Sequence, residues 1–145
     1  MQHRKKISLI LYCAMLLGAS PVLAEVPLRA QVAIELNSVE TVDQSCRISF
    51  MIQNGHAADI TQAVYEAVLF DTDGGVDRLT LFDFGELPAA RPRVRQFLIP
   101  GIECAQLGRV LINGAETCTG GSDLPEGACI TDLDLRSRTD VEILG

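Results

Sequence analysis

Apolar and polar residues alternate along most of the chain, and this period of two constrains the fold more than any other feature. In residues 32–36, Val32, Ile34 and Leu36 alternate with smaller or charged neighbours. Successive side chains of a β-strand point to opposite faces, so such segments are typical of strands with one buried face. The pattern predicts seven strands, at residues 32–36, 46–53, 64–71, 76–84, 93–99, 107–113 and 130–144. The last of them is expected to bend near Ser137.

Turn chemistry separates these segments. Asn54 and Gly55 follow the second predicted strand, Pro100 and Gly101 follow the fifth, and Gly114 follows the sixth. No segment has a convincing helical period, because the best candidate, residues 59–66, contains residues that suit a strand equally well. Short strands broken by turns predict an all-β fold, an immunoglobulin-like or fibronectin III-like β-sandwich of about seven strands.

The first 24 residues have the order of a secretory signal peptide. A basic start containing Arg4, Lys5 and Lys6 precedes a mostly apolar run of thirteen residues, 7–19, and the segment ends at Ala24. The apolar run is too short to span a bilayer comfortably, although an uncleaved membrane anchor is the alternative. We therefore expect removal of residues 1–24, which leaves residues 25–145 as one disulfide-stapled domain that is periplasmic or secreted and is not embedded in the membrane.

Removal of this segment makes the chain strongly acidic. The whole sequence has 12 basic and 19 acidic residues. The three basic residues of the first 24 are lost, so nine arginines and no lysine remain against 19 acids, a formal charge of −10. Binding to phosphate backbones or to anionic lipid needs a cationic face. The charge argues against nucleic acid and against anionic membrane surfaces as partners.

Four cysteines remain in the expected mature chain, and an even count in an exported protein indicates two disulfides. They are Cys46, Cys104, Cys118 and Cys129. No pair has the C-x2-C spacing of common zinc sites. Cys104 and Cys118 flank the sixth predicted strand, whose ends lie roughly 17 Å apart, whereas bridged Cα atoms lie about 4.4–6.8 Å apart. Cys118 and Cys129 flank a glycine-rich loop that closes easily, so the expected pairs are Cys118–Cys129 and Cys46–Cys104. The second pair suits an immunoglobulin-like order, in which the second and sixth strands begin at the same end.

The segment DTDGGVD, residues 71–77, has two interpretations. Asp-Gly between alternating apolar runs is a strong hairpin signal, because glycine accepts the positive φ of a tight turn. A calcium loop of the EF-hand type needs oxygen ligands at positions 1, 3 and 5, glycine at 6 and glutamate at 12. Counted from Asp71, those last three positions are Gly75, Val76 and Phe82. We therefore expect a turn, with a weak and irregular calcium site as the alternative.

Signatures of catalysis and of metal binding are missing from the sequence. It has no G-x-S-x-G, H-E-x-x-H, G-x-G-x-x-G or P-loop pattern. The expected mature chain has one histidine, His56, which we expect to be a solvated loop residue. The acidic residues are scattered, and those of the hairpin are expected to be solubilising charges. We therefore expect no enzyme activity, no cofactor and no metal site.

One cationic feature stands out, the segment RPRVR. Arg91, Arg93 and Arg95 alternate, so on an extended strand they share one face. One interpretation is a binding site for an anionic partner, because guanidinium groups match carboxylates. The alternative, which we favour from the sequence, is a solvated strand face whose arginines pair with acids of a neighbouring strand such as Asp77 or Asp83.

Part of the chain resembles a known set of proteins. The runs VYEAVLFDTDGGVDRLTLFDFGELPAARPRVRQF, PGIEC and RVLING and the ending SRTDVEILG resemble a set of short exported bacterial proteins. The resemblance covers residues 64–145. It implies export and one compact domain, but no established activity accompanies that set, so no functional residue is carried over.

Together these features predict a non-enzymatic module of the cell envelope, in the periplasm, that binds a protein or a glycan. Sandwich folds commonly carry such functions on loops or strand edges. The expected mature chain lacks tryptophan and has one tyrosine, Tyr65, so it offers no obvious aromatic platform for a sugar. A protein partner is therefore favoured. The alternative is a periplasmic protein that binds calcium or a small ligand through the DTDGG tip or the loop of residues 119–127.

Overall fold

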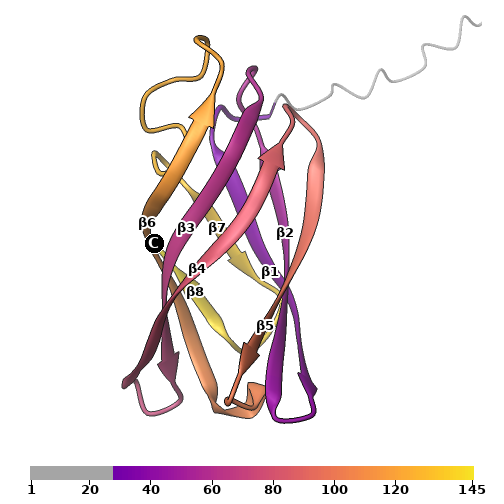
Figure 1. Ribbon diagram of the computed structural model, residues 1–145, viewed down its shortest axis with the longest axis vertical. Coiled ribbons are helices and arrows are strands. Elements are labelled where there is room, and N and C mark those ends of the chain that lie inside the picture. Colours follow the sequence, from indigo (N-terminus) through magenta and orange to yellow (C-terminus); the bar gives the residue numbers. More distant parts are fainter. Residues whose placement is uncertain (1–27) are drawn as a thin grey trace, which may run out of the picture.

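Eight strands and one short 3-10 helix form the part of the chain that the computed structural model describes, residues 28–145 (Figure 1). The strands are β1 (Val32–Val42), β2 (Ser45–Asn54), β3 (Ile60–Asp71), β4 (Val76–Leu87), β5 (Pro92–Pro100), β6 (Leu107–Gly120), β7 (Asp134–Ser137) and β8 (Glu142–Leu144). The helix η1 (Cys104–Gln106) precedes β6. The predicted signal peptide, residues 1–24, lies outside the described residues. Nowhere in residues 28–145 is there a helix long and apolar enough to cross a membrane.

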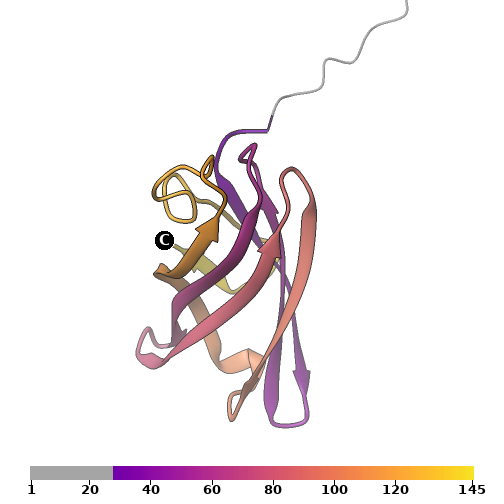
Figure 2. The ribbon, with the colours of Figure 1, turned by 45° about the horizontal axis from the view of Figure 1, so that its top comes forward.

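The strands form two four-stranded sheets that pack face to face (Figures 1 and 2). One sheet has the order β5-β2-β1-β7 and the other has the order β4-β3-β6-β8. The edge strands β4 and β5 lie on one side of the sandwich, and the short strands β7 and β8 lie on the other (Figure 1). The predicted all-β sandwich is confirmed. The second strand pairs with the fifth and the third with the sixth, as an immunoglobulin-like order requires.

The largest errors in the predicted strand ends are at the ends of the first and the sixth strand. β1 continues to Val42, and β6 continues through Gly114 to Gly120. The pairing of β3 with β6 shifts register on both sides of Gly114, between Val64 and Tyr65 and between Glu66 and Ala67. A glycine inside a strand often marks such a bulge, because it lets the backbone bend without breaking the ladder. Gly114 therefore bends the strand where it was expected to stop it.

The C-terminal segment does not form one strand. Residues 130–133 have no strand pairing, β7 runs parallel to β1, and β8 runs parallel to β6 in the opposite sheet. The predicted bend near Ser137 is present, since its hydroxyl donates to the carbonyl of Val141 at 2.6 Å and accepts from the amide of Thr139 at 3.1 Å. The alternation of residues predicted which side chains are buried, but it contained no information on which sheet each half joins.

The core lies between the sheets, and aromatic rings fill the half of it next to β4 and β5. Phe50 of β2, Tyr65 of β3, Phe82 and Phe84 of β4, and Phe97 of β5 form one cluster with ring centroids 4.6–6.5 Å apart. Edge-on and tilted aromatic pairs at these distances stabilise beyond the area they bury. Aliphatic residues of β1, β2, β3 and β6 fill the rest.

Both predicted disulfides are present. Cys46 bonds to Cys104 with a Cα separation of 4.8 Å, and Cys118 bonds to Cys129 with a separation of 6.0 Å. Cys46 lies near the start of β2, and Cys104 lies in η1 just before β6, so the first bridge links the facing sheets at the end where both strands begin. Two disulfides are typical of proteins from an oxidising, extracytoplasmic compartment.

Candidate functional site

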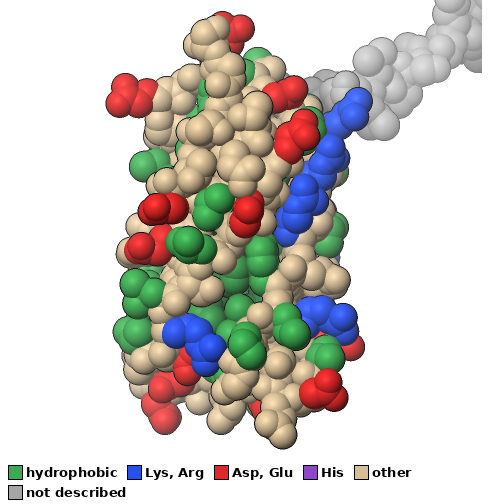
Figure 3. All heavy atoms as spheres, in the orientation of Figure 1, with side chains coloured by type: hydrophobic (Ala, Val, Ile, Leu, Met, Phe, Trp, Pro, Cys, Tyr) green, Lys and Arg blue, Asp and Glu red, His purple; other side chains and the backbone are tan. Residues whose placement is uncertain are grey.

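The predicted arginine row lies at the edge of the sandwich formed by β4 and β5. Arg91 is in the loop before β5, and Arg93 and Arg95 are on the strand. Arg93 and Arg95 share one face, as predicted, and it is the face that carries the half-buried Phe97 and the buried Ile99 further along β5. These two arginines therefore continue the inner face of β5. Arg91 is exposed in the turn just before the strand. Figure 3 shows the row as a line of blue side chains along β5.

Arg95 is part of the fold. Its Nε donates to the carbonyl of Phe84 at 2.8 Å, and its Nη1 donates to the carbonyl of Val94 at 3.1 Å. A longer contact of 3.4 Å runs from Nη2 to the carbonyl of Glu86. The guanidinium therefore joins the edge strand of one sheet to the edge strand of the other.

A second arginine makes the reciprocal link. Arg78 of β4 donates from Nη1 to the carbonyl of Pro100, at the end of β5, at 2.9 Å. Arg78 and Arg95 thus act as two clasps across the β4–β5 side of the sandwich.

The expected pairing of the arginine row with acids of the neighbouring strand was wrong. Asp77 pairs with its neighbour Arg78 at 2.5 Å, and Asp83 accepts hydrogen bonds from the Gln62 side chain at 2.6 Å and the Gly85 amide at 2.8 Å. Asp83 lies between the buried Phe82 and Phe84, so it projects from the outer face of its sheet and cannot meet a row on the inner face of β5.

The remaining two arginines of the row have no carboxylate partner among the described residues. The five arginines that form ion pairs are Arg47, Arg78, Arg109, Arg136 and Arg138. Arg91 is exposed, and Arg93 makes only a long contact, 3.4 Å, with the carbonyl of Pro92. Arg91 and Arg93 are therefore available to an anionic group, whereas Arg95 is engaged by the fold.

Exposed apolar side chains lie on both sides of the same edge, on the outer face of each sheet. Eight large hydrophobic side chains are exposed in the described part of the chain, and six of them lie on β2, β4 and β5. We call these six the edge surface: Met51, Val76, Leu79, Leu81, Val94 and Leu98. Met51 and Val94 face each other across the β2–β5 pairing. In Figure 3 hydrophobic side chains are visible over β3 and β4, next to the arginine row.

The sequence contained a signal for this surface that alternation alone did not reveal. In the segment LTLFDF of β4, the apolar residues change from odd to even positions between Leu81 and Phe82. The phenylalanines are buried, whereas Leu79 and Leu81 are 62% and 54% exposed on the opposite face. In a sandwich of two sheets only the inner face of each sheet is covered, so a strand with apolar residues on both faces leaves one set exposed. Such a change of parity points to a contact surface once the fold is known to have only two layers.

The DTDGG segment is a hairpin turn between β3 and β4, as predicted. The Asp71 amide donates to the Gly75 carbonyl at 2.9 Å, and Gly74 has a φ of 86°. Asp71 Oδ1 also accepts from the amides of Asp73 at 3.0 Å and Gly75 at 2.7 Å. The carboxylate that a calcium ion would need is thus used to hold the turn. No group of three or more potential metal ligands occurs in residues 28–145.

Calcium should therefore leave the stability of the protein unchanged. We expect the melting temperature to stay constant as calcium is raised from micromolar to millimolar concentration, because Asp71 already accepts two backbone hydrogen bonds. Differential scanning fluorimetry with magnesium as the control ion measures this. A saturable rise that disappears in Asp73→Ala would contradict the turn interpretation.

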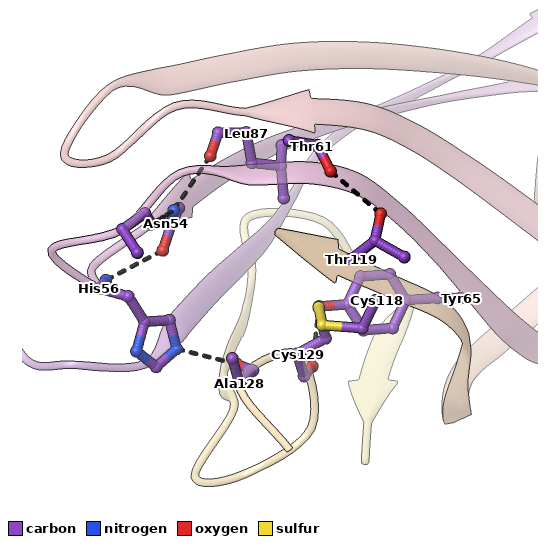
Figure 4. The surroundings of a disulfide bond; sticks show 10 residues. Asn54, His56, Thr61, Tyr65, Leu87, Cys118, Thr119, Ala128 and Cys129 are labelled. Carbon is purple, nitrogen blue, oxygen red and sulfur yellow. Dashed lines mark hydrogen bonds between the residues drawn. A yellow bond between two sulfur atoms is a disulfide. The ribbon is translucent and has the colours of Figure 1, made fainter. Parts of the chain in front are cut away.

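His56 is buried, so its prediction as a solvated loop residue was wrong. Its Nε2 donates to the carbonyl of Ala128 at 2.9 Å, and its amide donates to the Asn54 side chain at 2.9 Å (Figure 4). The Asn54 side chain in turn donates to the carbonyls of Ala58 and Leu87. Ala128 is 72 residues away in the sequence, so no local pattern could have revealed the contact.

The tyrosine hydroxyl makes a parallel contact to the same loop. Tyr65 donates to the carbonyl of Cys129 at 2.8 Å, and burial raises the pKa of Tyr65 well above its ordinary value, so the hydroxyl remains a donor. Together with the Cys118–Cys129 bond and His56, it holds the loop of residues 121–133 against the end of the sandwich (Figure 4). We interpret this cluster as structural.

A hollow beside β7 offers a second concave surface. Among its lining residues are Arg29, Gln31, Asp132, Asp134 and Arg136. Arg136 forms a bidentate pair with Asp134 at 3.0 and 2.5 Å, which raises the pKa of the arginine and neutralises both charges. Arg29 and Asp132, which form no ion pair among the described residues, are of opposite sign, so the hollow has no excess of positive charge like that of the β4–β5 edge.

The chemistry available at the β4–β5 edge is binding by apolar contact and by two guanidinium groups. The apolar side chains form the edge surface, and Arg91 and Arg93 lie beside it. Comparison of the chain with known protein families, with curated proteins and with solved structures gave no match in any of the three.

Proposed function

We propose that the protein is a non-enzymatic, exported module of the cell envelope that binds a protein partner through the edge surface. The observation that carries the proposal is that six of the eight exposed large hydrophobic side chains lie on the strands at this edge, three on the outer face of each sheet. Exposed apolar residues that occur singly need no explanation, whereas a grouped set is typical of protein–protein contacts. The two disulfides support an oxidising compartment such as the periplasm.

The surface is better suited to a protein than to a glycan. The described chain has no tryptophan, and its one tyrosine, Tyr65, is fully buried. Phe70 is half-buried under the guanidinium of Arg109, whose central carbon lies 5.9 Å from the ring centroid. No freely exposed aromatic ring remains among residues 28–145 on which a sugar could stack. Aliphatic side chains beside arginines instead match the apolar core and charged rim of protein interfaces.

Site-specific photo-crosslinking in intact cells tests this proposal. A photoreactive residue in place of Leu81 or Val94 should give a crosslink to one discrete envelope protein. The same residue in place of Ile130 is the control, because Ile130 is 52% exposed, close to the 54% of Leu81, but lies outside the edge surface. Equal crosslinking from all three positions, or none from Leu81 and Val94, would rule out the edge surface as the binding site.

A further inference from the structure

The open edge of β5 exposes a short row of backbone donors. Pro92 and Pro100 have no N–H to donate to β2. The pairing with β2 has no register shift, so Val94, Gln96 and Leu98 direct their backbone groups to the same side of β5 as the two prolines. The carbonyls of Pro92, Val94 and Pro100 accept from arginine side chains, which shows that these even-numbered residues face away from β2. The N–H groups of Val94, Gln96 and Leu98 therefore point to the open edge.

The two sides of this edge differ in chemistry. Arg93 lies on the inner side, Arg91 is exposed just before the strand, and neither has a carboxylate partner among the described residues. On the outer side lie the exposed Val94 and Leu98, with Met51 of β2 next to Val94. Successive side chains of a strand point to opposite faces. A strand added to β5 would thus place every second side chain beside the arginines and the others beside the apolar residues.

We propose that the β5 edge binds a short extended segment of the partner protein in which carboxylate and apolar side chains alternate. The inference rests on the proposed function and specifies the chemistry of its partner. The segment pairs with the three free N–H groups, as in other peptide complexes formed by strand addition. Its carboxylates meet Arg91 and Arg93, and its apolar side chains cover Val94 and Leu98. Prolines at both ends of β5 limit the pairing to about five residues.

Charge decides in favour of an acidic segment. Arg91 and Arg93 alternate along the chain, so carboxylates two residues apart on an extended segment match their spacing of about 7 Å. At physiological salt, charges more than about 8 Å apart are largely screened, so the local row outweighs the negative charge of the whole protein at contact. The other arginines on β2, β4, β6 and β7 already have carboxylate partners.

A second copy of the chain is a poorer occupant of the same edge. The described residues contain nine arginines and 18 acids, so two copies would each bring a formal charge of −9. Antiparallel pairing of two β5 strands would also place both arginine rows on one face of the joined sheet. Like charges in such positions are destabilising. A foreign acidic segment avoids both penalties.

Labelled peptides test the chemistry of the segment. The probe is a fluorescent peptide in which valine and glutamate alternate, and the control has lysine in place of every glutamate. The purified exported protein should bind the glutamate peptide at least about tenfold more tightly at physiological salt, because the lysine peptide repels Arg91 and Arg93. Nuclear magnetic resonance should place the largest amide shifts at Val94, Gln96 and Leu98. Equal affinity for both peptides, or shifts confined to another strand, would overturn the proposal.

Two matched sets of variants test the contribution of backbone pairing and the contribution of charge to peptide binding separately. Val94→Pro removes one edge donor and should abolish binding of the glutamate peptide, whereas Val94→Thr keeps the N–H and the branched shape and should still bind. Arg91→Glu with Arg93→Glu should reverse the preference between the two peptides, and this reversal decides the matter if Val94→Pro fails to fold. Arg95 stays unchanged because it clasps β4.

The result also separates this inference from the proposed function. Crosslinks from Leu81 and Val94 without peptide binding would reject the acidic segment and leave the edge surface as a protein-binding site. Peptide binding without crosslinks would reject the proposed partner in the cell. A dimer detected by sedimentation that Val94→Pro abolishes would overturn the inference in favour of a second copy.

Discussion

Removal of the Cys46–Cys104 disulfide should lower the free energy of unfolding by about 4 kcal/mol. The bond joins residues 58 apart in the sequence and links the start of β2 to η1 before β6. Without it, the unfolded chain regains the conformational freedom of a long loop, and the facing sheets lose their covalent link at that end. Since the whole domain is stabilised by roughly 5–15 kcal/mol, this loss is a large share.

The matched control is the other disulfide. Cys118 and Cys129 are only 11 residues apart, so their removal should cost about 3 kcal/mol on the same entropic argument. Both variants carry alanine at two positions, and urea unfolding followed by circular dichroism compares them. A larger loss for the Cys118–Cys129 variant would show that the loop of residues 121–133, which His56 and Tyr65 also hold, contributes more than the link between the sheets.

Phe50→Ala should lower the free energy of unfolding by about 3–5 kcal/mol. Phe50 is fully buried, and its ring lies 5.3 Å from Phe82, 5.6 Å from Phe84 and 6.0 Å from Phe97. It therefore connects β2 with the aromatic residues of both edge strands. Truncation removes these contacts and leaves a cavity that the surrounding rings fill only in part.

Two control variants make the effect of Phe50→Ala specific. Phe50→Leu keeps most of the apolar volume and should cost less than half as much. Phe70→Ala removes a ring of the same size from the outer face of β3, where it is half-buried, and should also cost less. Chemical denaturation of the three variants gives the comparison. Equal losses in the free energy of unfolding for Phe50→Ala and Phe70→Ala would mean that the aromatic cluster stabilises the fold no more than one half-buried ring on the surface.

The functional residues were only partly predictable. The row of Arg91, Arg93 and Arg95 was evident from its spacing, and Arg93 and Arg95 do share a face of β5. The sequence could not show that Arg95 bonds to carbonyls of β4 while Arg91 and Arg93 have no carboxylate partner, because that division depends on which strand lies across the gap. The expectation of ion pairs with Asp77 or Asp83 failed for the same reason.

What the sequence by itself determined was local. Asp-Gly between two alternating runs was enough for the hairpin, since positive φ at Gly74 is a property of a few neighbouring residues. The alternation of apolar and polar residues was enough to predict the strands and most of the buried positions. The disulfide pairing could also be predicted from the sequence, because strand length limits which cysteines can meet.

Only the tertiary structure decided which strands form an edge, and the proposed binding site depends on this. Leu79 and Leu81 would be ordinary interior residues if another layer covered β4, and they are exposed because no third layer packs against the outer face of their sheet. His56 is buried because the disulfide loop folds over it, and β7 and β8 separate because each finds a free neighbour in a different sheet. Such features depend on contacts between residues far apart in the chain, and local patterns carry no information about those contacts.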